Sequence, residues 1–120
     1  MARHYKELVV WQRAMDLVTE VYRVTERFPK HERFGLISQV RRAAVSVPSN
    51  IAEGQGRVSV GEFKQFLGHA RGPLFEVETQ VLIARNLEIV SKDGIQRLCE
   101  LVDEVGRLIN GLIRSLDTSN

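Results

Sequence analysis

The sequence is poor in cysteine and has no long apolar run. Cys99 is the single cysteine among 120 residues, so no disulfide can form within the chain, and no zinc-ligand spacing surrounds it. Structural disulfides are typical of oxidising compartments, so we expect a reducing, cytoplasmic location. No segment approaches the roughly 18 consecutive apolar residues of a membrane helix. The charged start, MARHYKEL, also lacks the pattern of a signal peptide, and the sequence predicts a soluble protein.

Motifs of catalysis and of metal or cofactor binding are also missing. His4, His31 and His69 share no motif, and no glutamate lies three residues before a histidine, as a di-iron bundle would need. The sequence contains no HExxH, no phosphate-binding loop and no GxGxxG. No nucleophile, base and orienting group are brought together by spacing. We therefore expect no catalytic residue, no metal and no cofactor.

Charge is small overall and unevenly distributed. The net charge is +2, but residues 1–60 carry 10 Lys and Arg against 6 Asp and Glu, whereas residues 61–120 carry 7 against 9. The first half therefore has a balance of +4 and the second half of −2. Such a chain could steer a polyanion to its basic part. The opposite charges could equally pair helices or neighbouring subunits with one another.

Apolar residues recur every three or four positions in four segments, which indicates four helices. The most regular stripe is Ile95, Leu98, Val102, Val105, Ile109, Leu112 and Leu116. We predict helices at about residues 8–27, 34–54, 60–89 and 92–116. No segment alternates like a strand, and the connections are short. The sequence thus predicts an all-α, antiparallel up-down four-helix bundle that forms one domain over residues 1–120.

The first segment has more apolar surface than one core requires. Leu8, Trp11, Met15, Val18, Tyr22 and Thr25 form one stripe, and Val10, Ala14, Leu17, Val21, Val24 and Phe28 form a second. A helix with two apolar stripes needs a second covering surface, which favours a homo-oligomer.

Prolines and glycines predict local features of the middle helices. Pro48 and Pro73 fall inside periodic segments, where each should bend its helix without ending it. Gly54 and Gly56 suit a left-handed cap at the end of the second helix.

A polar stripe follows the second segment. Gln39, Arg42, Ser46, Asn50 and Glu53 recur at steps of three and four. One interpretation is a small polar site for phosphate or a carboxylate, and the other is a structural network that sets helix register. Arg42 has Glu76 and Glu78 as candidate partners on the third helix.

A second candidate site is a basic rim of Lys30, Arg33 and Arg57, joined by Arg41 and Arg42. These arginines and lysines could position phosphates, or they could simply form a solvated face.

Several stretches of the chain resemble the four-helix-bundle or 23S rRNA-intervening-sequence protein family. The similarity is densest in FPKHERFGLISQVRRAAVSVPSNIAEG and extends through VWQRAMDLVTEVY and FLGHARGPLFEVETQ, over roughly residues 5–90. Pro73 departs from the serine that the family usually has there. The resemblance implies an antiparallel four-helix bundle in ring-shaped homo-oligomers, namely pentamers. It also implies an association with coding sequences inserted in ribosomal RNA genes, which motivates the hypothesis of nucleic-acid binding. The family motif falls on Arg41, Arg42, Ser46, Asn50, Glu53 and Gly54.

Three functional hypotheses follow from these features. The first is a non-enzymatic oligomer that binds RNA or DNA through a basic rim. The second is a protein-interaction scaffold without nucleic-acid binding. The third is a small-anion or small-molecule site at the polar stripe of the second helix.

Overall fold

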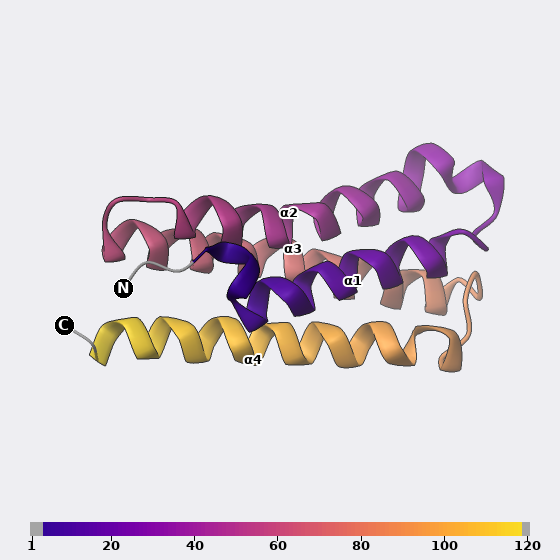
Figure 1. Ribbon diagram of the computed structural model, residues 1–120. Coiled ribbons are helices and arrows are strands. Elements are labelled where there is room, and N and C mark those ends of the chain that lie inside the picture. The colour runs from indigo at the N-terminus through magenta and orange to yellow at the C-terminus, as the bar shows by residue number, and fades with distance from the viewer. Residues whose placement is uncertain (1–3, 119–120) are drawn as a thin grey trace.

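The computed structural model describes residues 4–118, which form four long helices lying side by side (Figure 1). These are α1 (Val9–Thr25), α2 (Ser38–Gln55), α3 (Val60–Asn86) and α4 (Gln96–Thr118). Short helical turns precede or connect them: η1 (Tyr5–Glu7), η2 (Lys30–Glu32), η3 (Arg33–Ile37) and η4 (Asp93–Ile95). No strand occurs among the described residues, and the predicted all-α, four-helix fold is confirmed.

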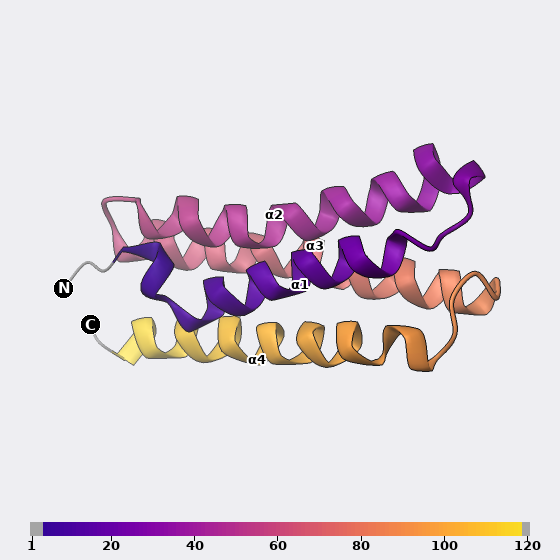
Figure 2. The same cartoon turned by 45° about the vertical axis from the view of Figure 1, so that its right-hand side comes forward.

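Successive helices run in opposite directions along the bundle (Figures 1 and 2). α1 contacts α2 and α4, and α3 contacts the same two helices, with the most extensive contact between α2 and α3. The bundle is elongated, measuring 48 × 23 × 20 Å along its principal axes. Its two ends are therefore separate surfaces. No helix within residues 4–118 is long and apolar enough to cross a membrane.

The core runs the length of the bundle and takes side chains from every helix. Leu17, Val47, Leu74 and Leu98 are examples that are completely buried. Burying one such side chain stabilises the fold by about 1.5–3 kcal/mol, so the repeated stripes supply most of the driving force. The spacing of these residues by three and four is the pattern that predicted the helices.

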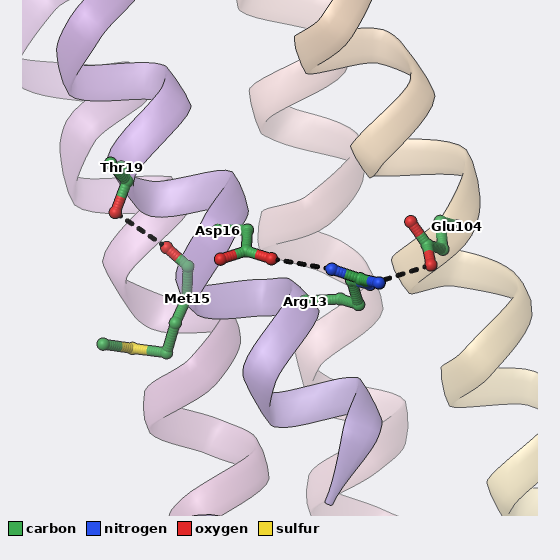
Figure 3. Close-up of polar contacts among 5 residues, drawn as sticks. All are labelled: Arg13, Met15, Asp16, Thr19 and Glu104. Carbon is green, nitrogen blue, oxygen red and sulfur yellow. Dashed lines mark hydrogen bonds and ion pairs between the residues drawn. The ribbon is translucent and has the colours of Figure 1, made fainter.

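A charged contact joins the first and last helices, α1 and α4. The Arg13 Nε donates to Glu104 Oε2 at 3.0 Å, and its Nη1 donates to Asp16 Oδ2 at 3.0 Å (Figure 3). The same view shows the Met15 side chain pointing to the other side of α1, away from Glu104. The two sides of α1 therefore differ: one is held against α4 by charge, and the other carries exposed apolar surface.

The observed helix ends differ from the predicted ones where local hydrogen bonds intervene. α1 stops at Thr25 and not near residue 27, because the Arg27 and Phe28 amides donate three residues back and tighten the last turn. Before α2, the segment η3 forms a wider turn in which Gly35 leaves helical geometry (φ −105°, ψ −112°). The regular part of the second helix therefore begins at Ser38 and not at residue 34.

The third and fourth helices differ from prediction at the turn between them. α3 ends at Asn86 and not near residue 89, because Glu88 adopts a left-handed conformation (φ 60°). The Ile89 amide then donates back to the Ala84 carbonyl at 2.9 Å, which closes the helix end. α4 begins at Gln96, after the short turn η4 that the prediction had merged with it.

Gly54 has a different role from the predicted left-handed cap. No glycine among the described residues has a positive φ. A Cβ at Gly54 would lie 2.5 Å from Phe66 Cβ and 3.3 Å from Phe63 Cδ1, both on α3. Glycine is therefore needed here because the two helices approach closely, and not because of backbone conformation.

Both proline-containing helices continue through the proline, as predicted, since Pro48 lies inside α2 and Pro73 inside α3. The size of any bend at these positions stays a prediction.

We expect Gly54→Ala to destabilise the protein by about 1–3 kcal/mol, because the added methyl group overpacks the contact with Phe66. Urea denaturation followed by circular dichroism measures the change. Gly111→Ala is the matched control, since a Cβ there meets nothing within 4 Å. It should stabilise the helix by up to about 1 kcal/mol through helix propensity. Equal effects of the two substitutions would contradict the close-packing explanation.

Candidate functional site

Arg41 joins α2 to the last turn of α1. Its Nε donates to Thr25 Oγ1 at 2.8 Å, and the Thr25 hydroxyl donates in turn to the Val21 carbonyl at 2.7 Å. The guanidinium lies over the Tyr22 ring, 4.3 Å from its centroid, and 3.5 Å from Glu26 Oε2. Several contacts from one helix thus fix the orientation of this cation, which makes Arg41 a structural residue as well as a charged one.

A depression of about 340 Å³ lies beside Arg41, between the end of α1 and the start of α2. Three cationic side chains line it, from Lys30, Arg33 and Arg41, together with Thr25, Glu26, Phe28 and Ile37. Lys30 and Arg33 are exposed, and neither side chain makes a hydrogen bond or ion pair within residues 4–118. Cations without carboxylate partners remain available to an external anion. We call Lys30, Arg33 and Arg41 the cationic cluster.

Arg42 lines the next depression along the same face, of about 440 Å³, which also includes Arg41. Its guanidinium is exposed and makes no hydrogen bond or ion pair within residues 4–118. The predicted pairing with Glu76 or Glu78 is therefore not formed. Glu78 lies instead near Cys99 of α4, whose thiol it influences electrostatically. Arg42 thus joins Lys30 and Arg33 as a third cation without a carboxylate partner, whereas Arg41 is paired with Glu26.

The remaining residues of the polar stripe bond mainly to their own helix. The Ser46 hydroxyl donates to the Arg42 carbonyl at 3.1 Å, and the Asn50 side-chain amide donates to the Ser46 carbonyl at 2.8 Å. Glu53 Oε2 accepts from Arg57 Nη2 at 3.0 Å. Such back-bonds satisfy a polar group locally. The structure does not gather Arg42, Ser46, Asn50 and Glu53 into one depression, because only Arg42 and Ser46 line the second one.

Gln39, at the start of the stripe, is the member that reaches another helix. The Gln80 Nε2 on α3 donates to Gln39 Oε1 at 3.4 Å. Gln39 therefore lies at the seam between α2 and α3, and the interpretation as a structural network applies to this position.

Arg57 lies at the opposite end of the bundle from Lys30 and Arg33. It follows α2, whereas those two residues precede it, and Figure 1 shows the two connections at opposite ends. Its guanidinium pairs with Glu53 and lies 4.7 Å from the centroid of the Phe66 ring. The structure thus brings Lys30, Arg33 and Arg41 together, but it does not place Arg57 in the same rim.

An apolar depression of about 340 Å³ continues this face toward the other end. It is lined by Tyr5, Trp11, Met15 and Val18 on one side and by Val45, Pro48, Ser49 and Ala52 on the other. Val45 is shared with the second depression, and Arg41 is shared between the second and the cationic one. Together the three form a continuous surface, which we call the α1–α2 groove. It is apolar at one end and cationic at the other.

The α2 wall of this groove was not predicted, although a signal for it exists. Val45, Pro48 and Ala52 follow one another at steps of three and four, which makes a second apolar stripe on the outer side of α2. The sequence predicts a surplus apolar stripe for the first helix only. The structure places that stripe, through Trp11 and Met15, in the same groove.

A separate depression of about 550 Å³ surrounds Cys99, between α3 and α4. Burial, followed by the charges of Glu78 and Asp103, raises the pKa of the Cys99 thiol, while Arg85 lowers it. The thiol is therefore protonated near neutral pH and is a poor nucleophile. Among residues 4–118, no group of three or more His, Cys, Asp or Glu side chains could hold a metal ion.

Comparison with known proteins gives one family and one fold. A family model described as the 23S rRNA-intervening sequence protein matches residues 6–111. A crystal structure of a protein with unknown function, from the S23 ribosomal protein family of Bacteroides thetaiotaomicron, is similar with a TM-score of 0.78. The two chains are 18% identical over 88% of this chain and 98% of that one, which shows the fold alone. A comparison with curated proteins finds no match.

We expect the alkylation of Cys99 by iodoacetamide to have a midpoint above the ordinary pKa of a cysteine thiol. The pH–rate profile, read by mass spectrometry, measures this. Asp103→Asn should lower the midpoint, because removing a negative charge favours the thiolate. Asp93→Asn is the control: Asp93 lines the same depression but is not among the charges that shift this thiol. A midpoint at or below the ordinary value would contradict the burial of the thiol.

Proposed function

The chain belongs to the 23S rRNA-intervening sequence protein family, and from this premise we propose that it is a non-enzymatic, oligomeric protein that binds nucleic-acid phosphates at the cationic end of the α1–α2 groove. The observation that carries the proposal is the convergence of Lys30, Arg33 and Arg41 on one depression. Phosphate contacts of this kind give affinity without reading sequence.

Two features support a phosphate ligand over a small molecule. The cationic depression is open to solvent along the groove, and its available cations continue to Arg42 in the next depression. A row of cations suits the regularly spaced charges of a nucleic-acid backbone. The stripe residues Ser46 and Asn50, by contrast, bond to their own helix, so they add little to a small-molecule site.

The apolar end of the groove supports assembly into a homo-oligomer, with the pentamer of the family resemblance as the expected state. Met15 is 42% exposed and Val45 is 43% exposed, although both lie beside the half-buried Trp11. Contiguous exposed apolar surface on a folded protein marks an interaction site. A second copy of the chain is the partner that we propose. A different protein partner, as in a scaffold, is the rival occupant of the same surface.

We expect the double substitution Lys30→Gln with Arg33→Gln to weaken binding to a fluorescently labelled RNA in a salt titration. Each lost phosphate contact should reduce the slope of log K against log salt by about 0.7–0.9. The matched control is Arg107→Gln with Arg114→Gln, which removes the same charge from exposed positions on α4.

Binding that falls equally in both double variants would show a general effect of net charge and would exclude the cationic cluster. No binding by the unmodified protein at low salt, with the oligomer intact, would exclude the proposed function altogether.

We expect Met15→Glu to lower the mass of the assembly in light scattering at micromolar concentration, because a carboxylate would be buried in the subunit contact. Val58→Glu is the control, since Val58 is also apolar but is fully exposed in the α2–α3 connection. Circular dichroism checks that both variants are folded. A monomeric unmodified protein, or an intact assembly in Met15→Glu, would contradict this contact.

A further inference from the structure

Phe34 is an aromatic side chain that points into solvent beside the cationic cluster. It is 89% exposed, more than any other aromatic residue among the exposed large apolar residues. The next apolar residues, Leu36 and Ile37, turn inward and pack against the core. The exposure of Phe34 is therefore specific to this position in η3 and is not shared by the whole segment.

Local hydrogen bonding holds the turn that presents Phe34. The Leu36 amide donates to Glu32 Oε1 at 3.1 Å, so the Glu32 side chain caps the turn. A Cβ at Gly35 would lie only 2.8 Å from the same Glu32 oxygen. Glycine at this position therefore allows the carboxylate to reach the amide. The Glu32 cap on the Leu36 amide and the close approach of Glu32 to Gly35 fix the backbone around Phe34. The Phe34 ring is therefore carried by an ordered turn.

Exposed positive charge flanks this ring along the chain. Lys30 and Arg33 are exposed and line the cationic depression. The one carboxylate in the segment, Glu32, is occupied by the Leu36 amide and lies 3.8 Å from His31. The turn thus combines an exposed aromatic ring with Lys30 and Arg33, whose side chains have no ion-pair partner within residues 4–118.

We propose that Phe34 is a stacking platform for an unpaired base, with the neighbouring phosphates bound by Lys30 and Arg33. The inference rests on the proposed function and narrows its ligand to single-stranded nucleic acid. Aromatic stacking combined with a positively charged surface is the physical basis of single-strand binding, and it tolerates any base sequence. Bases within a duplex are already stacked and cannot lie on an external ring. Charge complementarity favours this ligand over a protein partner, for which Phe34 would be an apolar anchor.

The test compares a labelled single-stranded RNA of 12 uridines with a blunt-ended RNA duplex made of two strands, using the full chain over a series of salt concentrations. Phe34→Ala should weaken binding to the single strand by roughly 5- to 150-fold, which is the effect of losing one stacked base. Binding to the duplex should change little. Phe34→Trp should keep or raise single-strand affinity, since its ring also stacks.

Phe75→Ala is the matched control, because Phe75 is a 55% exposed phenylalanine on α3. It should leave both affinities unchanged. The slope of log K against log salt should stay the same in Phe34→Ala, because stacking releases no counterion from phosphate, whereas loss of Lys30 and Arg33 reduces that slope.

The remaining outcomes separate this inference from the proposed function. If the unmodified protein binds neither RNA, the proposed function fails and the inference fails with it. If it binds but Phe34→Ala behaves like Phe75→Ala, the inference alone is overturned. A lower mass of Phe34→Ala in light scattering would show that Phe34 is a subunit contact, and this would also overturn the inference.

Discussion

The contact between Arg41 and the last turn of α1 is the interaction on which the cationic end of the molecule depends. The Arg41 Nη2 donates to the Tyr22 carbonyl at 3.4 Å, which also accepts from the Glu26 amide at 3.1 Å, while the Arg41 Nε donates to the Thr25 hydroxyl oxygen. Hydrogen bonds to a charged group contribute about 1.5–3 kcal/mol, whereas an exposed pair such as Arg57 with Glu53 contributes about 0–1 kcal/mol. The partly buried Arg41 contact is therefore the stronger constraint. It holds the last turn of α1 against the first turn of α2, and the turn carrying Lys30 and Arg33 must span these two points.

The number and type of helices could be predicted from the sequence because each helix buries a repeated apolar stripe. Leu98, Val102 and Val105 show this pattern within a few turns of α4, and no tertiary information is needed to read it. The ends of the helices could not be predicted equally well. Glu88 has a left-handed backbone although it is not glycine, and Gly35 leaves helical geometry because Glu32 caps the turn. These features arise from contacts between residues, and single-residue preferences do not reveal them.

Many residues of the candidate site could be predicted from the sequence, but their arrangement in space could not. The string from Arg41 to Glu53 was identified, but side chains such as Ser46 and Asn50 satisfy themselves on their own helix, which spacing alone cannot show. The separation of Arg57 from Arg33 could have been predicted from the length of α2. At 1.5 Å per residue, the 18-residue helix α2 places its ends roughly 27 Å apart. Phe34 was overlooked because the sequence contains no alternation of aromatic and basic residues, whereas one ring on a capped turn is enough for stacking.

The geometry of the groove also determines how an assembly would gain affinity. Arg41 and Val45 each line two of the three depressions, so the apolar surface proposed for subunit contact adjoins the cations proposed for phosphate. The bundle is 20–23 Å across, and charges on neighbouring subunits would be separated by a comparable distance. That distance exceeds the screening length of about 8 Å at physiological ionic strength, so the fields of separate clusters would not simply add. Several clusters could instead hold one flexible strand at once, which raises the effective concentration of each further contact. Assembly would then favour a single strand long enough to reach more than one subunit, because a short oligonucleotide would engage only one cluster.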